Sequence, residues 1–163
     1  ESLADLVGEG AEVLGRLRGE VAKWEITRLL AGPYDQLGAR LEITAGAGGT
    51  DAQDWAEMLE RMYVRWGEAS DYKVAVVERT PGDSAGIKSC TIEFTGRFAY
   101  GYLASEKGTH RLVRISPFKS GSDSRQTSFA GVEVLPVLAE EPAGLEIPDG
   151  DLEISTTRSG GAG

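Results

Sequence analysis

The residues best equipped for chemistry lie in a basic stretch, residues 111–119, that we expect to be irregular. Its middle, residues 116–118, reads Ser-Pro-Phe and combines a hydroxyl, a rigid ring and an aromatic side chain. Proline fixes its own φ and favours an extended conformation in the preceding residue, so the tripeptide should form a stiff loop. Such a loop with cations beside it could read a single-stranded nucleic acid, but a proline turn between two strands explains these residues equally well. The cations in and just after the stretch are Arg111, Arg114, Lys119 and Arg125.

The charge distribution argues against a protein that coats nucleic acid in general. The chain has 163 residues and a formal net charge of −9, whereas coating proteins neutralise phosphates with a basic surface. Residues 105–125 nevertheless contain five Lys and Arg residues against two acidic ones, and residues 133–153 contain seven acidic residues and no Lys or Arg. A local basic stretch on an acidic body fits docking at one defined RNA site.

Length and composition indicate a globular protein of one or two domains. No apolar run reaches 18 residues, which excludes a transmembrane helix, and we expect no membrane partner. Cys90 is the only cysteine, so no disulfide can form within the chain, and its surroundings predict a small buried strand residue. The chain begins with Glu1 and shows no signal-like segment, from which we expect a fragment or a processed form.

The first 31 residues are predicted to be helical, because apolar side chains recur there at three- and four-residue spacing. Gly8 and Gly10 are predicted to break this segment into two helices, and residues 32–35 form a turn. Short amphipathic helices of this kind usually pack on a partner or on a helix that is missing here. We therefore expect them to pack loosely.

The middle of the chain predicts one long helix among several strands. The helix runs from Thr50 to about residue 70, with Thr50 as N-cap and Gln53 completing a capping box. Its apolar stripe consists of Trp55, Met58, Leu59, Met62, Tyr63 and Trp66. Strands are predicted at residues 41–45, 73–78, 88–95, 98–104 and 131–138, with a tight hairpin at Gly96 and Arg97.

These patterns predict an α+β fold in which N-terminal helices precede a sheet packed on one long amphipathic helix. We divide the chain into an N-terminal helical segment, residues 1–35, and a central α+β domain, residues 36–138. Residues 139–163 form an acidic linker and the start of a truncated second α+β domain, whose first strand is expected at residues 151–157.

Two further features could carry chemistry but lack the partners that it needs. The glycine-rich loop at residues 46–49 lacks the ending of a P-loop and a dinucleotide fingerprint, which leaves at most a weak anion site at a helix N-terminus. His110 is the only histidine, and no nucleophile or carboxylate is designated to work with it, so we expect it to pack at a strand end or to face RNA. Without a Cys/His cluster, a zinc site is excluded.

A set of motifs in fixed order makes the chain similar to bacterial-type class I peptide chain release factors. These motifs are GAGGTDAQDW at 46–55, RMYVRW at 61–66, GIKS at 86–89, YGY at 100–102, GTHRLVR at 108–114 and the Ser-Pro-Phe tripeptide. The resemblance runs from about residue 30 to the end of the chain and more loosely through the N-terminal helices. The words EKGTH at 106–110, RQTSF at 125–129 and GVEV at 131–134 resemble the cyanobacterial and plastid branch.

The resemblance implies that the helix tip at Gly48 and Asp51 reads the first base of a stop codon. In the family the Ser-Pro-Phe tripeptide separates UGA and UAA from UAG, and a threonine matching Thr127 reads the third base. Gln126 stands where bacterial members usually have a stacking histidine, and the loop at 119–125 is longer than usual. The codon-reading set is therefore Ser116, Pro117, Phe118, Gln126, Thr127, Gly48 and Asp51. Without the resemblance, a helix cap and a polar strand entry would explain several of these residues.

The end of the chain matches the approach to the family's Gly-Gly-Gln tip, with Gly160, Gly161 and Gly163 in the tip loop. By itself this stretch would be a flexible glycine tail. The catalytic glutamine is expected just past Gly163. The resemblance thus implies a termination factor that reads UGA or UAA in the ribosomal A site and triggers peptidyl-tRNA hydrolysis.

The partners implied are the ribosome, through its RNA and the stop codon of the mRNA, and a termination GTPase. The factor is not expected to be an enzyme by itself, because the ribosome supplies most of the active site, and no metal or organic cofactor is implied. The expected compartment is the plastid stroma in a eukaryote and otherwise the bacterial cytoplasm. An alternative left open is a non-catalytic RNA-binding paralogue, for example one that binds or stabilises plastid transcripts.

The Ser116 hydroxyl is expected to be exposed. Replacing it should therefore weaken release at UGA and barely change thermal stability.

Overall fold

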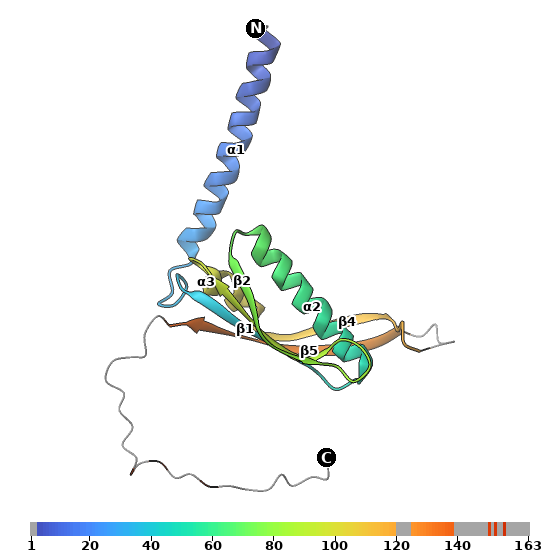
Figure 1. The fold of residues 1–163 in the computed structure, drawn as a ribbon. Coiled ribbons are helices and arrows are strands. Elements are labelled where there is room, and N and C mark those ends of the chain that lie inside the picture. Colours follow the sequence, from blue (N-terminus) through green and yellow to red (C-terminus); the bar gives the residue numbers. More distant parts are fainter. Residues whose placement is uncertain (1–2, 120–124, 139–149, 151, 153–154, 156–163) are drawn as a thin grey trace.

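The structure is a computed structural model that describes residues 3–119, 125–138, 150, 152 and 155. One long helix projects from an antiparallel sheet that carries a second helix on one face (Figure 1). The sheet has five strands in the order β2-β3-β1-β5-β4. This arrangement confirms the predicted α+β class. The expected strand at 151–157, most of the acidic linker and the three tip-loop glycines lie outside the described residues.

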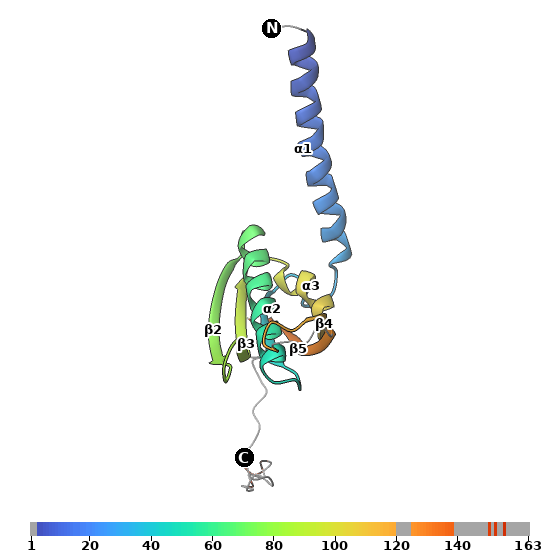
Figure 2. The same cartoon turned by 90° about the vertical axis from the view of Figure 1, so that its right-hand side faces the viewer.

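The projecting helix α1, Leu3–Leu29, is a single element, so the predicted break at Gly8 and Gly10 is wrong. Glycine in a helix interior costs about 1 kcal/mol relative to alanine, which weakens the helix without ending it. Both views show α1 standing away from the sheet (Figures 1 and 2). Its apolar side chains are largely exposed, including Leu17 and Trp24. Within the described residues, no helix combines the length and apolar content that crossing a membrane requires.

The three inner strands form the core of the sheet, and they confirm the predicted strands with longer bounds. These strands are β1, Gly38–Ala45, β3, Ile87–Thr95, and β5, Arg125–Val137. One face of each strand is buried, and the alternation of buried and exposed side chains is that of a half-covered antiparallel sheet. The core residues from these strands include Leu41, Ile43, Ile92, Phe94, Val132 and Val134. Cys90 belongs to this core as predicted, and burial raises the pKa of its thiol to about 12.

The helix α2, Thr50–Ala69, covers the buried face and matches the predicted long helix (Figure 2). Leu59 and Tyr63 are buried against the sheet, whereas Met62 is 46% exposed and leaves the predicted apolar stripe. The predicted capping box is wrong, because no side chain caps this helix and Gly49 precedes its first residue with φ 61°. The amide of Gln53 instead makes two hydrogen bonds with Asp83, of 2.9 and 3.0 Å.

The region between β3 and the last strands differs from the prediction of a tight hairpin and a strand at 98–104. Phe98 has a left-handed φ of 69°, which turns the chain into α3, Ala99–Leu103, and a 3₁₀ turn, Ala104–Glu106. Backbone bonds from Tyr100 and Gly101 to the segment before β1 hold α3 near the inner strands β1 and β5. The edge strands are β2, Lys73–Pro81, and β4, Gly108–Ile115. The first half of the basic stretch, expected to be irregular, is therefore part of β4.

A pair of glycine substitutions tests the role of backbone conformation. We expect Gly10→Ala to raise the helical signal in circular dichroism, because Gly10 lies in a regular helix with no atom within 4 Å of the added Cβ, and alanine favours helix by about 1 kcal/mol. Gly86→Ala should lower the free energy of unfolding by more than about 1 kcal/mol, because φ is +69° there and the new Cβ would lie 2.1 Å from the Gln53 carbonyl oxygen. Circular dichroism measures the first variant and urea denaturation the second, and a loss of helical signal in Gly10→Ala would contradict the assignment of α1 as one helix.

Candidate nucleic-acid interface

The candidate site lies where the N-terminal turn of α2 meets the end of β4. Ser116 directly follows β4, and Asp51 is in the first turn of α2. The Ser116 hydroxyl donates a 2.8 Å hydrogen bond to Asp51 Oδ2 and accepts a 3.1 Å bond from the Phe118 N–H. The fold thus brings together two motifs that are 65 residues apart in the sequence.

The position of Ser116 corrects the expectation of an exposed hydroxyl that contributes little to stability. Its residue exposure is 6%, so the side chain is buried, while Pro117 is exposed and Phe118 is 42% exposed. The hydroxyl closes the loop on itself through Phe118 and ties it to α2 through Asp51. A buried hydroxyl with two partners is a structural element of the loop, whatever else it binds.

Arg114, one of the cations predicted to contact RNA, is turned toward α2. Its Nη2 lies 2.5 Å from Asp54 Oδ2 and 4.0 Å from Asp51 Oδ1, and its Nη1 lies 3.6 Å from Met58 Sδ. The Arg114 side chain is 26% exposed, and its Nε is buried without a hydrogen-bond partner among the described residues. Asp54 was not singled out from the sequence. The sequence could have pointed to Asp54, because Asp51 and Asp54 are three residues apart in the first turn of a helix and therefore share a face.

The other predicted site residues lie on or near strands β4 and β5, some on each face of the sheet. Arg114 pairs with Gln126, and Val113 pairs with Thr127. Because strand side chains alternate, Gln126 lies on the face that α2 covers, and Thr127 lies exposed on the opposite face. Lys119 Nζ donates a 3.1 Å hydrogen bond to Gln126 Oε1. The structure therefore brings Asp51, Ser116 and Phe118 into contact but separates Thr127 from them by the thickness of the sheet.

The remaining predicted residues occupy the margins of this site. The loop before α2 is fixed to β5 by a 2.8 Å bond from the Gly46 N–H to the Phe129 carbonyl oxygen. Gly48 has φ +148°, a conformation that L side chains rarely adopt. Arg111 and Arg125 are exposed on the face of the sheet that carries Thr127.

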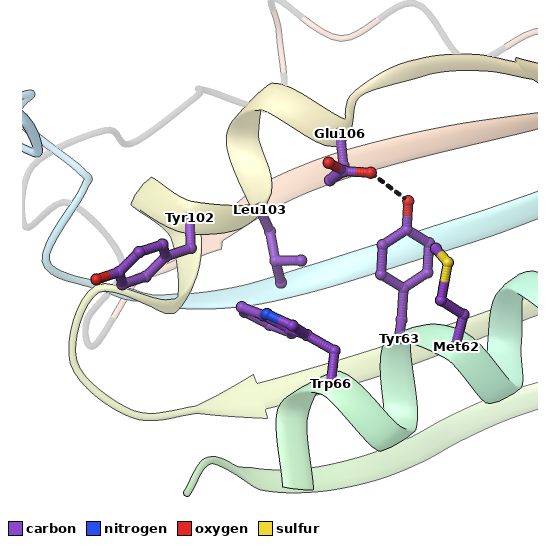
Figure 3. A pocket seen from close by; sticks show the side chains of 6 residues that line it. All are labelled: Met62, Tyr63, Trp66, Tyr102, Leu103 and Glu106. Carbon is purple, nitrogen blue, oxygen red and sulfur yellow. Dashed lines mark hydrogen bonds between the residues drawn. The ribbon is translucent and has the colours of Figure 1, made fainter. Parts of the chain in front are cut away.

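A polar cluster that includes the only histidine lies farther along α2. Tyr63 donates a 2.9 Å hydrogen bond to Glu106 Oε2, and His110 Nε2 lies 2.9 Å from the Glu106 carbonyl oxygen and 3.4 Å from the Tyr63 hydroxyl. Burial, followed by the bond to Glu106, raises the pKa of Tyr63. Figure 3 shows Tyr63 and Glu106 pointing at each other from facing elements. They line a pocket of about 300 Å³ whose other lining residues are Met62, Trp66, Tyr102 and Leu103.

The cluster has no arrangement of side chains for hydrolytic chemistry. His110 packs under α2 within β4, as one of the two roles expected for it, and its ring nitrogen contacts a carbonyl and a phenol. Within the described part of the chain, no group of three or more His, Cys, Asp or Glu side chains could hold a metal ion.

The buried hydroxyl gives a stability prediction for the site. Ser116→Ala should lower the free energy of unfolding by roughly 1–3 kcal/mol, because it leaves the Asp51 carboxylate and the Phe118 N–H without this partner. Ser105→Ala is the matched control, since the Ser105 hydroxyl is exposed and makes only a long 3.4 Å bond. Urea denaturation of both variants measures the difference, and equal stability would contradict the role assigned to Ser116.

Comparisons with known proteins agree with this arrangement. The family model of the PCRF domain matches residues 1–132. Peptide chain release factor PrfB1, chloroplastic, of Arabidopsis thaliana is 60% identical over 158 residues, which are 97% of this chain and 34% of that protein. Peptide chain release factor 2 of Chloroflexus aggregans is 52% identical over 164 residues, or 100% of this chain and 43% of that protein.

The fold gives the same relationship. The solved structure of RF2 of Thermus thermophilus superposes with a TM-score of 0.71 and 40% sequence identity, covering 100% of this chain and 45% of that one. The chain thus spans less than half the length of each of these relatives. Sequence and fold together place the chain in the PCRF domain family, with the bacterial and plastid peptide chain release factors as its relatives.

Proposed function

We propose that the chain is the codon-recognition part of a translation termination factor that reads UGA and UAA in the ribosomal A site. The observation that carries this proposal is the hydrogen bond between Ser116 and Asp51. It joins the Ser-Pro-Phe tripeptide to the tip of α2, which are the two motifs that the family resemblance connects with stop codons. The proposal also agrees with the names of the relatives, which are peptide chain release factors.

The roles assigned to single residues are compatible with their positions. Gly48 and Asp51 at the tip of α2 would meet the first base, and Ser116 with Pro117 and Phe118 the second. The exposed ring of Phe118 can stack on a base without displacing a core residue. Thr127, which lies on the outer face of β5, would meet the third base there. Gln126 would replace the usual stacking histidine, with its amide held by Lys119.

Peptide release itself would need the Gly-Gly-Gln tip that the resemblance places just past Gly163. Its glutamine would position water on the ester of peptidyl-tRNA, and the ribosome would supply most of that active site. The protein would then be a ribosome-dependent factor and not an independent enzyme. The partners would be ribosomal RNA, the stop codon of the mRNA and a termination GTPase, with Arg111, Lys119 and Arg125 near the RNA.

The proposed compartment follows from the same relatives. One relative is described as chloroplastic and others are bacterial, so we infer the plastid stroma for a eukaryotic source and the bacterial cytoplasm otherwise. The alternative of a non-catalytic RNA-binding paralogue receives no support from the names of these relatives. Gln126 is the residue that would distinguish such a paralogue, and the release experiment decides between the two.

Release of a labelled peptide from programmed ribosomes tests the proposal. We expect the full-length protein to release peptide at UGA and UAA and to be at least tenfold less active at UAG or a sense codon, because an unmatched hydrogen-bonding edge costs roughly 1–3 kcal/mol. Gln126→His should keep or raise activity, since histidine is the usual residue there. Equal release at UAG and UGA would overturn the codon assignment. Stop-codon binding without any release would favour the paralogue.

A further inference from the structure

The pocket beside Tyr63 is a second candidate binding site, separate from the Ser116 site. It has a volume of about 300 Å³ and lies between the second half of α2 and the segment that runs from α3 into the 3₁₀ turn. This volume is at the lower end of the range for small-molecule sites, so an occupant has to be small. An α-helix rises about 1.5 Å per residue, which places Trp66 roughly 20 Å along α2 from Asp51. A ligand in this pocket would therefore not meet the Ser116 site.

Three aromatic rings form walls of the pocket and are held in place without a ligand. The rings belong to Tyr63, Trp66 and Tyr102. Figure 3 shows Tyr63 and Trp66 reaching from α2 toward Tyr102 on the facing segment. Trp66 packs against Tyr72 and Phe94, at ring-centroid distances of 5.4 and 5.8 Å, and Tyr63 is buried. Because these walls are already ordered, a ligand would pay little entropy to arrange them.

The pocket also contains a carboxylate that has no cation beside it. Glu106 is half-buried, and its Oε2 accepts the bond from the Tyr63 hydroxyl. Among the described residues, no Lys, Arg or His nitrogen lies within 4.0 Å of this carboxylate. The neighbouring Lys107 pairs instead with Glu133 at 2.8 Å, and His110 Nε2 contacts the main-chain carbonyl of Glu106. A negative charge that is partly shielded from water, next to aromatic rings, attracts a positively charged ligand.

The hydrogen-bonding groups of the lining indicate which kind of cation fits. A primary ammonium has three N–H donors, and each needs an acceptor where water is excluded. The side chains of Met62, Trp66 and Leu103 offer no oxygen acceptor, and the hydroxyl of Tyr102 points away from Glu106 in Figure 3. A methylated ammonium carries the positive charge but has no N–H to satisfy, and its methyl groups can pack on aromatic faces.

We propose that this pocket binds a methylated ammonium group, with Glu106 as its counter-charge and the rings of Tyr63, Trp66 and Tyr102 as its walls. A free small molecule such as choline presents this group, and so does a trimethylated lysine side chain. The proposal goes beyond the function proposed above and does not depend on it, since none of these residues belongs to the Ser116 site.

Nuclear magnetic resonance of the full-length protein with isotope-labelled tryptophan tests this proposal. Choline should move the indole N–H signal of Trp66, which Trp66→Phe identifies, and the change should saturate. Two matched compounds should bind about tenfold more weakly or not at all. One is the neutral isostere of choline, in which a tert-butyl group replaces the trimethylammonium, and the other is protonated ethanolamine, which keeps the charge but lacks the methyl groups. The signal of Trp24, which is 73% exposed on α1, is the internal control and should not move.

Three variants assign the binding to the pocket. Glu106→Gln keeps an acceptor for the Tyr63 hydroxyl but removes the charge, and it should weaken choline binding about tenfold. Tyr102→Leu removes a half-buried wall and should weaken binding roughly threefold to tenfold, which keeps the proposal testable if Glu106→Gln does not fold. Glu133→Gln is the control, because it removes a carboxylate that pairs with Lys107, and it should leave choline binding unchanged.

A comparison of two probes distinguishes the sources of the ammonium group. Tighter binding of an acetylated trimethyl-lysine amide than of choline would assign the pocket to a modified protein side chain, and the reverse order to a free small molecule. The absence of a saturable change with both probes would overturn the proposal. Equal binding of choline and either matched compound would overturn it too, as would unchanged choline affinity in Glu106→Gln. None of these results bears on the proposed function, which peptide release from ribosomes tests separately.

Discussion

The burial of α2 against the inner strands is the constraint on which the rest of the structure depends. Leu59 and Tyr63 lock the helix over the sheet, and Glu60, only 10% exposed, is fixed by Arg79 on β2. With its axis fixed, the first turn of α2 has one possible position, next to the end of β4. The site is therefore rigid for the same reason that the core is, and its polar contacts do not need to hold it alone.

The elements that bury one face could be predicted from the sequence, because periodicity records which face is buried. That signal identified α2 and the inner strands, with their ends misplaced by a few residues. It failed at residues 98–104, where Phe98 takes a left-handed conformation and the chain turns into α3. It failed at α1 as well, because Gly8 and Gly10 are unfavourable in a helix by themselves but do not outweigh the residues around them.

The residues of the site could be predicted from the sequence, but their arrangement could not. The order of motifs identified Ser116 and Asp51, yet their hydrogen bond depends on the packing of α2, which no local pattern records. For the same reason the burial of Ser116 was missed, since proline-containing loops are usually exposed. Arg114 is predicted to contact RNA because its charge is visible in the sequence, whereas its pairing with Asp54, 60 residues away, is not.

Two of the basic residues predicted to contact RNA form contacts within the protein. Arg114 is paired with Asp54, and Lys119 is bonded to Gln126, so these charges also order the loop. Arg111 and Arg125 are exposed on the outer face, and neither forms an ion pair with the described residues within 4.0 Å. With few cations facing outward, neutralisation of phosphates can supply only part of the binding energy. The proposed binding of RNA would then have to draw on base edges and stacking as well.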